Sequence, residues 1–510
     1  MKLLYVSAVS AALLIDEKGD YYSREAYTLY VNGSLVSGET SVISLYGLDP
    51  DTEYEVRCGA ETLFFRTKDE YCCLNVRDFG AKGDGETDDT PAIQAAICAC
   101  PENGRVLIPE GSYHVLPLFL KSCITLEIAK GAQLLLCTDM NAFPVLPGRA
   151  DAKNAHGEYI IGGWEGEAHV SRASAINGFG LKNVNIIGEG TVNGRGGEAG
   201  WWLNPKTGDK PARPRMLYLR DCEHVTVQGV HFINSPSWNL HPCFSRDLSF
   251  ISVRVTAPRK SPNTDGFDPE SCSGVRVLGT RFSTGDDCIA IKSGKMYMGK
   301  EYKTPCEDIE IAYCLMLDGH GGVTVGSEMS GGVKHVRVHS CLMEGNDRGL
   351  RIKTRRGRGK WGVIDDIEFT DVKMVRVKAP LTVNAMYFCD ADGKGPYVQN
   401  REKQPVDEGT PTIGSVTFER VTATDCQACC AYMLGLPENP ARELRLKDCV
   451  FAMDAHAEPM SPVMACGVEP SVRKGIYARF VDKVTLENVS MTGVEGDEVT
   501  VDDVGELVRR

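Results

Sequence analysis

Beyond residue 180 the chain repeats a short pattern, in which an apolar, a polar and an apolar residue precede a turn and another short strand-like stretch. The first copy is Val184-Asn185-Ile186 and the last is Val484-Thr485-Leu486. Between them lie copies that begin at Val225, Leu248, Val275, Ile309, Val336, Ile367, Val416 and Leu444. Neighbouring copies begin about 20 to 50 residues apart, which is the period typical of solenoid proteins. The pattern therefore predicts short strands that stack turn upon turn.

Alternation places the first and third residues of each copy inward, so the stacked turns build one long apolar core. Helical periodicity is nearly absent here, which excludes a doubly wound α/β fold. One short helix is expected near residue 90, where Asp89 or Thr90 can cap it and Pro91 fits its first turn. We therefore expect an all-β fold, a right-handed parallel β-helix, over residues 74–510.

Residues 1–68 show a different pattern, that of a small β-domain. Short strands separated by polar turns are expected at residues 27–31, 35–45, 53–57 and 63–66. The segment 48–54, Leu-Asp-Pro-Asp-Thr-Glu-Tyr, resembles the fibronectin type III signature in which a tyrosine packs at a strand corner. We therefore expect residues 1–68 to form a fibronectin type III-like β-sandwich.

The apolar run of residues 3–15 follows Lys2 and allows two interpretations. It imitates the hydrophobic region of a signal peptide, but it is too short for a transmembrane helix. Alternatively, it supplies the first two strands of the β-domain. A β-sandwich needs about seven strands, and cleavage near residue 15 would leave too few. We expect the second interpretation and hence a cytoplasmic protein; secretion is the alternative.

Composition changes this picture little, but it excludes some partners. The chain has 510 residues, of which 25% are charged and 42% hydrophobic, an ordinary globular balance. The formal net charge of −13 argues against nucleic acid as the main partner. The 20 cysteines are too dilute for a disulfide scaffold, so in a cytosolic chain they would serve as small buried apolar residues.

Four short segments of the repeating region carry candidate chemistry, and about one turn of the solenoid separates each from the next. They are Asn263-Thr264-Asp265, Gly285-Asp286-Asp287, Gly319-His320-Gly321 and Arg351-Ile352-Lys353. A spacing of one turn places residues side by side on one face, so three carboxyl groups, one imidazole and two cations are expected to converge. Asp286 and Asp287 both reach that face only if the chain bends, which Gly285 permits.

This combination favours hydrolysis of an acidic sugar chain. Glycoside hydrolysis needs one protonated carboxyl group as acid and one carboxylate that activates water. Crowding three carboxyl groups raises the pKa of at least one, and the groups titrate as a coupled set. His320, between two glycines, can approach the acid or a sugar hydroxyl closely. Arg351 and Lys353 lie on one face of a strand and suit a carboxylate-bearing sugar.

These segments resemble the four signature motifs of glycoside hydrolase family 28, the polygalacturonases. The resemblance covers roughly residues 74–490 and includes the segment 188–194 (GEGTVNG), Trp201-Trp202 and the run 286–294 (DDCIAIKSG). It implies inverting hydrolysis of α-1,4-galacturonosyl bonds without a metal or another cofactor. The implied partner is a galacturonate oligosaccharide or polysaccharide.

The resemblance also implies roles for individual residues. Asp286 matches the general acid, and Asp265 and Asp287 match the pair that positions and deprotonates the attacking water. His320 matches the histidine that assists the acid. Galacturonate binding falls to Asn263, Arg351 and Lys353. The family uses a tyrosine in substrate binding as well, for which Tyr387 and Tyr432 are candidates.

Other features resemble bacterial exo-acting members, which release sugar units from the non-reducing end. These features are the N-terminal module and the segments 238–242 (WNLHP) and 326–332 (GSEMSGG). Exo action would need loops that block one end of the groove. The basic run 351–360 holds six cations and no acid, which is the local patch that a polyanion requires.

Several alternatives remain open at this point. An endo-polygalacturonase or a rhamnogalacturonan or xylogalacturonan hydrolase would use the same fold. A pectate lyase would abstract a proton, usually with calcium, and leave a double bond. A non-catalytic glycan-binding β-helix, such as an adhesin, would share only the fold. A galacturonan hydrolase that acts from the chain end is the function we expect.

Overall fold

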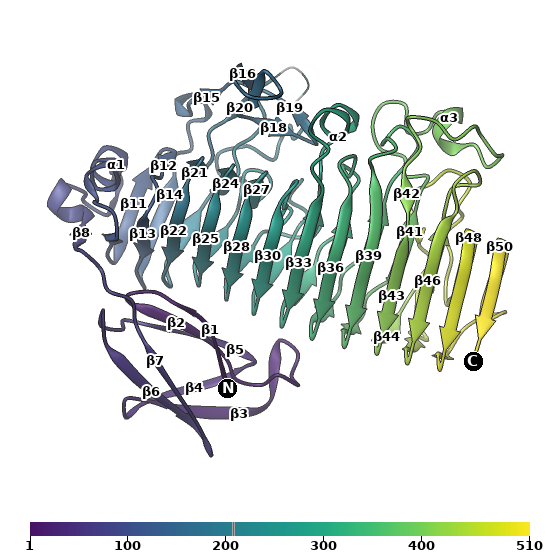
Figure 1. Ribbon diagram of the computed structural model, residues 1–510, viewed down its shortest axis with the longest axis horizontal. Coiled ribbons are helices and arrows are strands. Elements are labelled where there is room, and N and C mark those ends of the chain that lie inside the picture. Colours follow the sequence, from purple (N-terminus) through teal and green to yellow (C-terminus); the bar gives the residue numbers. More distant parts are fainter. Residues whose placement is uncertain (207, 209) are drawn as a thin grey trace.

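The computed structural model of the protein describes residues 1–206, 208 and 210–510 (Figure 1). A solenoid of stacked turns runs the length of the molecule, and a small β-module of the N-terminal residues lies against its side. The solenoid is a right-handed parallel β-helix, which confirms the fold predicted from the repeat.

Each complete turn contributes strands to three rows that run along the solenoid. The first row is the long sheet at the front of Figure 1; its strands are β8 (Cys73–Asn75), β10 (Gly104–Ile108), β13 (Ile124–Ile128), β22 (Lys182–Ile187), β25 (Glu223–Gln228), β28 (Arg246–Ile251), β30 (Ser273–Leu278), β33 (Cys306–Ala312), β36 (Val333–His339), β39 (Val363–Thr370), β42 (Thr412–Ile413), β43 (Ser415–Glu419), β46 (Ala441–Lys447), β48 (Lys474–Glu487) and β50 (Val499–Arg509).

The second row is a 13-stranded parallel sheet. Its strands are β9 (Asp84–Asp88), β11 (Gly111–Val115), β14 (Ala132–Leu136), β23 (Thr191–Asn193), β26 (His231–Ile233), β29 (Arg254–Thr256), β31 (Arg281–Thr284), β34 (Leu315–Asp318), β37 (Leu342–Glu344), β40 (Lys373–Val375), β44 (Thr422–Cys426), β47 (Val450–Met453) and β49 (Ser490–Thr492).

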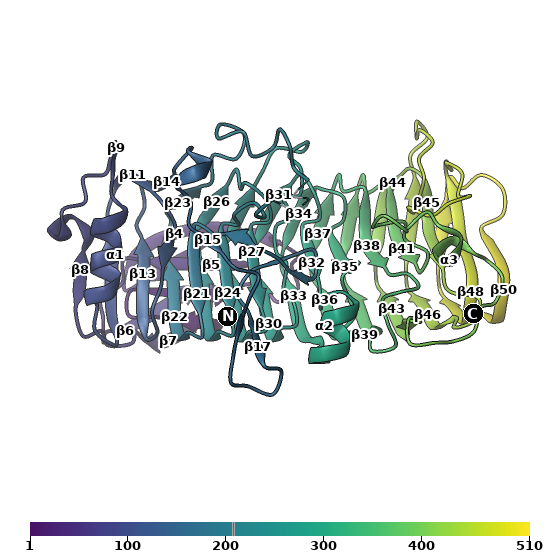
Figure 2. The same cartoon turned by 90° about the horizontal axis from the view of Figure 1, so that it is seen from above.

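The third row lies along the middle of the view from above (Figure 2) and positions the candidate site. Its strands are β12 (Leu118–Phe119), β21 (Ile176–Phe179), β24 (Leu217–Arg220), β27 (Leu240–Cys243), β32 (Ile289–Ile291), β35 (Val323–Val325), β38 (Arg348–Lys353), β41 (Ala379–Asn384) and β45 (Cys429–Leu434).

All ten predicted triplets are register partners in the first row. Val184 pairs with Val225, Val225 with Leu248, and each later copy pairs with the one before it, up to Leu444 with Val484. The first and third residues of the triplets are buried, as the alternation predicted. A single apolar core therefore runs through the solenoid.

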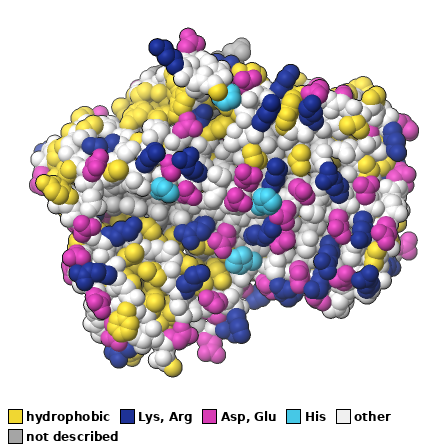
Figure 3. Space-filling view, in the orientation of Figure 1, with side chains coloured by type: hydrophobic (Ala, Val, Ile, Leu, Met, Phe, Trp, Pro, Cys, Tyr) yellow, Lys and Arg dark blue, Asp and Glu magenta, His cyan; other side chains and the backbone are white. Residues whose placement is uncertain are grey.

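The middle residues of the triplets point outward, onto the face seen in Figure 3. At four successive positions these residues are Arg276, Glu310, Arg337 and Glu368. Acidic and basic side chains are correspondingly interspersed on this face (Figure 3). Because the charges alternate in sign, this sheet offers no field of one sign to a polyanion.

The start of the solenoid is closed by the 3-10 helix η1 (Val76–Phe79) and by helix α1 (Thr90–Ala99), which confirms the helix expected near residue 90. Its capping differs from the prediction. The Asp89 carboxylate accepts hydrogen bonds from the backbone amides of Lys82 and Gly83 and not from α1. The Thr90 hydroxyl likewise accepts from Leu116.

The N-terminal module is built from two antiparallel sheets. Its strands are β1 (Lys2–Val6), β2 (Ser10–Leu14), β3 (Tyr22–Val31), β4 (Ser34–Thr40), β5 (Val42–Tyr46), β6 (Glu53–Cys58) and β7 (Glu61–Arg66). The apolar run 3–15 thus supplies β1 and β2, whereas the single strand predicted over 35–45 is two strands, β4 and β5. The Tyr54 hydroxyl accepts a hydrogen bond from the Asp49 amide, 2.8 Å away, so this tyrosine fastens a strand corner.

The module is attached to the solenoid through a buried apolar contact. Leu14 and Val42 of the module pack with Ile251, Leu278 and Tyr313 of the solenoid. Nearby, the Ser10 hydroxyl donates to the buried side chain of Gln228 over 2.6 Å. Because this interface is apolar and closed by buried hydrogen bonds, the two parts form one packed unit.

Long loops rise above the third row. One, between β14 and β21, holds the 3-10 helix η2 (Met140–Ala142) and the strands β15 (Val145–Leu146), β16 (Arg149–Asp151), β17 (Glu158–Ile160), β18 (Gly163–Trp164), β19 (Glu167–Ala168) and β20 (Ser171–Arg172). Two others hold the helices α2 (Met296–Tyr302) and α3 (Pro396–Gln399). No helix in the described part of the chain combines the length and apolar character that a membrane span requires.

Candidate active site

The predicted site residues meet on the third row, in successive turns of the solenoid. Asp286 and Asp287 directly precede β32, and His320 precedes β35. Gly285 is required by close backbone packing at this turn, because a Cβ atom at this position would lie only 2.3 Å from the Ser261 carbonyl oxygen. The tight turn brings the carboxyl groups of both aspartates to the cluster.

Three carboxyl groups form the centre of the site. Oxygen atoms of Asp265, Asp286 and Asp287 all lie within 4.8 Å of one another. Asp265 and Asp287 are buried, whereas Asp286 is partly exposed. Three negative charges at this distance repel one another strongly, so the surroundings of each group decide which of them is ionised.

Two cations hold the carboxylate of Asp287. Arg351 Nη1 lies 3.1 Å from Oδ1, and Lys353 Nζ lies 2.9 Å from Oδ2. Burial alone would raise the pKa of Asp287, but Lys353 and Arg351 outweigh it and hold this pKa well below its usual range. Asp287 is therefore the member of the cluster that stays ionised, and both of its oxygens are engaged.

Asp286 is paired with His320 at the open side of the cluster. His320 Nδ1 lies 3.0 Å from Oδ1 of Asp286, and the imidazole is half exposed. The hydrogen bond to Asp286 raises the pKa of His320. An imidazolium here would donate to Asp286 and leave its second oxygen free to face a bound sugar.

Asp265 is the second buried carboxyl group of the cluster. Burial and the neighbouring carboxylates of Asp286 and Asp268 raise its pKa well above the ordinary value. Asn263, two residues earlier, accepts a hydrogen bond from Arg213 Nη2 over 2.6 Å. The side chain of Asn263 thus joins the cleft wall to a buried guanidinium group.

The cluster lies in a cleft with a volume of about 790 Å³. All seven predicted site residues line it. The cleft also includes residues that sequence reasoning missed, which are Trp164, Glu165, Trp238, Lys292, Glu328 and Asp390. Trp238 and Glu328 belong to segments that were noticed only for their resemblance to exo-acting proteins.

Comparison with known proteins identifies the family of the chain. The model of the glycosyl hydrolases family 28 matches residues 152–461, and that of the rhamnogalacturonase A/epimerase, pectate lyase-like family matches residues 73–156. A probable polygalacturonase of Vitis vinifera is 30% identical over 408 residues, which cover 76% of this chain and 77% of that protein. The chain belongs to glycosyl hydrolases family 28.

Solved structures resemble this family 28 glycoside hydrolase along most of its length. The family 28 exopolygalacturonase of Yersinia enterocolitica covers 100% of this chain and 98% of its own, with a TM-score of 0.73 and 18% identity. The hyperthermoactive exopolygalacturonase of Thermotoga maritima covers 84% of this chain and 93% of its own, with a TM-score of 0.64 and 26% identity. The first similarity shows the fold and spans the module as well.

The two candidate tyrosines of the family 28 enzyme lie in different places. Tyr387 lines the cleft, with the guanidinium of Arg351 5.7 Å and the ammonium of Lys353 5.4 Å from its ring centre. Tyr432 stacks on Tyr477 and lies outside the cleft. Only Tyr387 is therefore placed to contact a molecule bound there.

The basic run 351–360 of the enzyme is not the open patch that the sequence predicted. Arg355, Arg356 and Arg358 are buried in ion pairs with acidic residues distant in sequence, for example Arg356 with Glu438. Lys360 is exposed but pairs with Glu408. The surrounding loops supply the acids, so only Arg351 and Lys353 of the run face the cleft.

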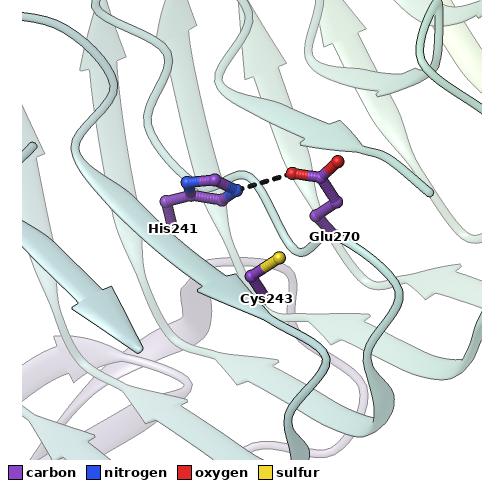
Figure 4. Close-up of side chains that lie close together, drawn as sticks. All are labelled: His241, Cys243 and Glu270. Atoms are coloured by element: carbon purple, nitrogen blue, oxygen red, sulfur yellow. Dashed lines mark hydrogen bonds and ion pairs between the residues drawn. The ribbon is translucent and has the colours of Figure 1, made fainter. Parts of the chain in front are cut away.

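A second cluster lies buried beneath the cleft of the hydrolase, in the strand β27 and the turn after it (Figure 4). His241 Nε2 is 2.9 Å from Oε2 of Glu270, and the thiol of Cys243 lies beside them. Burial, with a smaller effect of the Arg215 charge, lowers the pKa of His241 to about 4 despite this contact. The positive charge of Arg215, which acts on His241, also disfavours a metal ion at this cluster.

Proposed function

We propose that the enzyme hydrolyses α-1,4-galacturonosyl bonds of galacturonan. The observation that carries this proposal is the meeting of three carboxyl groups with Arg351, Lys353 and Tyr387 in one cleft. The carboxyl groups supply acid and base, and the cations suit a sugar that bears a carboxylate. A rhamnogalacturonan would offer these cations fewer sugar carboxylates, and a xylogalacturonan would offer bulkier, substituted sugars.

The surroundings of each carboxyl group support a division of roles. Asp286 has one oxygen on His320 and faces the open side, so it is placed to protonate the leaving oxygen. Asp287 is held ionised and is suited to orient the attacking water, whose proton it can receive together with Asp265. Asp265 completes the water site; because its pKa is raised, it shares protons with the other two groups as one coupled set.

Inversion of the anomeric centre is expected, although the carboxyl oxygens lie within 4.8 Å, closer than the about 6.5–9.5 Å common in inverting enzymes. Both oxygens of Asp287 are engaged by Lys353 and Arg351, which makes this carboxylate a poor nucleophile. Proton NMR during rapid hydrolysis should therefore show the β-anomer of galacturonate first. Initial formation of the α-anomer would show a retaining reaction instead.

We propose further that the enzyme acts from the non-reducing end. The hairpin of β18 and β19 reaches over the cleft, where Trp164 stacks on Trp238 with ring centres 4.8 Å apart. The Gly166 carbonyl accepts from the Lys295 amide, and Lys295 Nζ lies 2.9 Å from Asp390 in a third loop. The loops thus close one border of a cleft whose volume lies in the range of about 300–1,000 Å³ typical of small-ligand sites.

A galacturonate hexamer labelled at its reducing end should test this mode of action. Exo action from the non-reducing end should give labelled pentamer first, then labelled tetramer, with unlabelled monomer as the other early product. Chromatography of early time points measures these species. Labelled dimer and trimer at the earliest times would show endo action, and an unsaturated product that absorbs ultraviolet light would show a lyase.

We also propose a cytoplasmic location, in which the enzyme would act on imported oligogalacturonides. Removal of residues 1–15 would delete β1 and β2, whose side chains pack in the module and against the solenoid. All 20 cysteines lie in the described part of the chain and are free thiols, in keeping with a reducing compartment. Sequencing the amino terminus of the native protein tests this proposal: a start near residue 15 would contradict it.

A further inference from the structure

A buried lysine lies beneath the carboxyl cluster and takes no part in the mechanism described above. Lys292 follows β32, and its side chain is 5% exposed. Its ammonium lies 3.3 Å from Oε2 of Glu328, 3.5 Å from Oδ1 of Asp268 and 4.7 Å from the ring centre of Trp238. A buried ammonium is costly unless it is paired, so these contacts imply a purpose for the charge.

Asp268 makes this arrangement unusual. Its side chain is completely buried, and neither carboxyl oxygen accepts a hydrogen bond within the described residues. Lys292 is the cation that pairs with it. Burial nevertheless raises the pKa of Asp268 to about 7, so its proton is held loosely near neutral pH.

The charges around Lys292 come from every element packed against it. Arg351 and Lys353 are engaged with Asp287. Lys292 faces both Asp265 and Asp268, whereas the buried guanidinium groups of Arg213 and Arg215 each face one of these two carboxyl groups. The titratable groups that face Lys292 are Glu165 in the hairpin, His241 in β27, Asp265 and Asp268 after it, Asp287 before β32, Glu328 after β35 and Lys353 in β38.

We propose that Lys292 is a positioning residue, which with Glu328 sets how many protons the catalytic carboxyl cluster holds in the resting enzyme. This inference rests on the proposed hydrolase function and deepens it. Lys292 favours the ionised forms of Asp265 and Asp287 through space. Glu328 opposes it from the other side, because its carboxylate neutralises part of the ammonium charge.

Two substitutions should move the acid limb of the pH profile in opposite directions. Lys292→Gln removes a positive charge, so the cluster should hold its protons to higher pH, and the acid limb of kcat/KM should rise by about one pH unit. That shift corresponds to a roughly tenfold loss of kcat/KM on the limb. Glu328→Gln removes a negative charge, so the acid limb of kcat/KM for this variant should move to lower pH.

A matched control separates this effect from the loss of a buried ion pair as such. Glu438→Gln breaks the buried pair with Arg356, which lies outside the cleft, and should lower the melting temperature with no displacement of the limb. If Lys292→Gln does not fold, the downward shift in Glu328→Gln still decides the question.

The role of Lys292 would be overturned if the acid limb of kcat/KM stayed in place in the folded variants, or if it moved in the same direction in Lys292→Gln and Glu328→Gln. Either result would leave an active galacturonan hydrolase. A parent protein that releases no sugar from oligogalacturonides at any pH between 4 and 7 would overturn the proposed function, and this inference with it.

Discussion

Replacing Asp286 by asparagine should lower kcat by about 10²–10⁴-fold while substrate binding is kept. The amide has the shape of the carboxyl group and can still accept the hydrogen bond from His320, which now spans 3.0 Å. It cannot give a proton to the leaving sugar oxygen. Reducing-sugar release from a galacturonate trimer measures kcat, and calorimetric titration with the same trimer measures binding.

Asp366→Asn is the matched control for this experiment. Asp366, in β39, also pairs with a histidine, since its Oδ2 lies 2.6 Å from Nδ1 of His335, but it lies away from the cleft. This variant should keep the parent's kcat. A kcat for Asp286→Asn near that of the parent would remove Asp286 from the reaction, and a parent that binds without turnover would identify a glycan-binding protein.

Replacing Lys353 by methionine should have the second largest effect. The variant keeps the apolar stem of the side chain but removes one of the two cations that hold Asp287. An opposite charge at this distance lowers a carboxyl pKa by about 1–3 units, so the acid limb of kcat/KM should move up by a similar amount. Under the proposed function KM should rise as well, because Lys353 lines the cleft and its loss would remove a cation that suits a sugar carboxylate.

The same substitution should change how stability depends on pH. The depressed pKa of Asp287 means that its ion pairs stabilise the fold above the ordinary carboxyl pKa and lose this contribution as the pH falls toward the depressed value. Lys353→Met should therefore be less stable than the parent at both pH 7 and pH 4, and the difference should shrink only as the pH falls from 4 toward 2, as urea unfolding over this range would measure.

Lys360→Met provides the comparison for the Lys353 variant. Lys360 belongs to the same basic run but is exposed and paired with Glu408, so its loss should change neither limb nor KM. Equal kinetics in the parent and Lys353→Met would contradict the role of the Asp287 ion pairs.

Much of the fold could be predicted because the solenoid is a local repeat. Each triplet carries its own inward and outward positions, and the stacking turns require nothing more from distant sequence, so all ten triplets were found in register. The strand predicted over 35–45 failed because alternation continues across Ser41, where the chain passes from one sheet of the module to the other.

The candidate site was only partly predictable, for a physical reason. Aspartates and a histidine spaced by one turn of the solenoid predict a cluster, and the structure brings these side chains together. The partners of Arg356 and Asp268 cannot be read from nearby residues, because Glu438 comes from a loop far along the chain and Lys292 follows an apolar strand. The hairpin at 163–168 has no periodicity at all, so its place over the cleft depends on packing alone.

The two ends of the solenoid are protected unequally, and this determines where the molecule first opens. Helix α1 covers the first turns, and the N-terminal module packs against the side of the solenoid. At the other end, most residues of β50 are exposed. In a stack where each turn contacts only its neighbours, fraying is expected to start at the least covered turn and to progress inward. Backbone amides near the carboxyl terminus therefore exchange their hydrogens soonest, while the turns that carry the carboxyl cluster, in the middle of the stack, are the last to loosen.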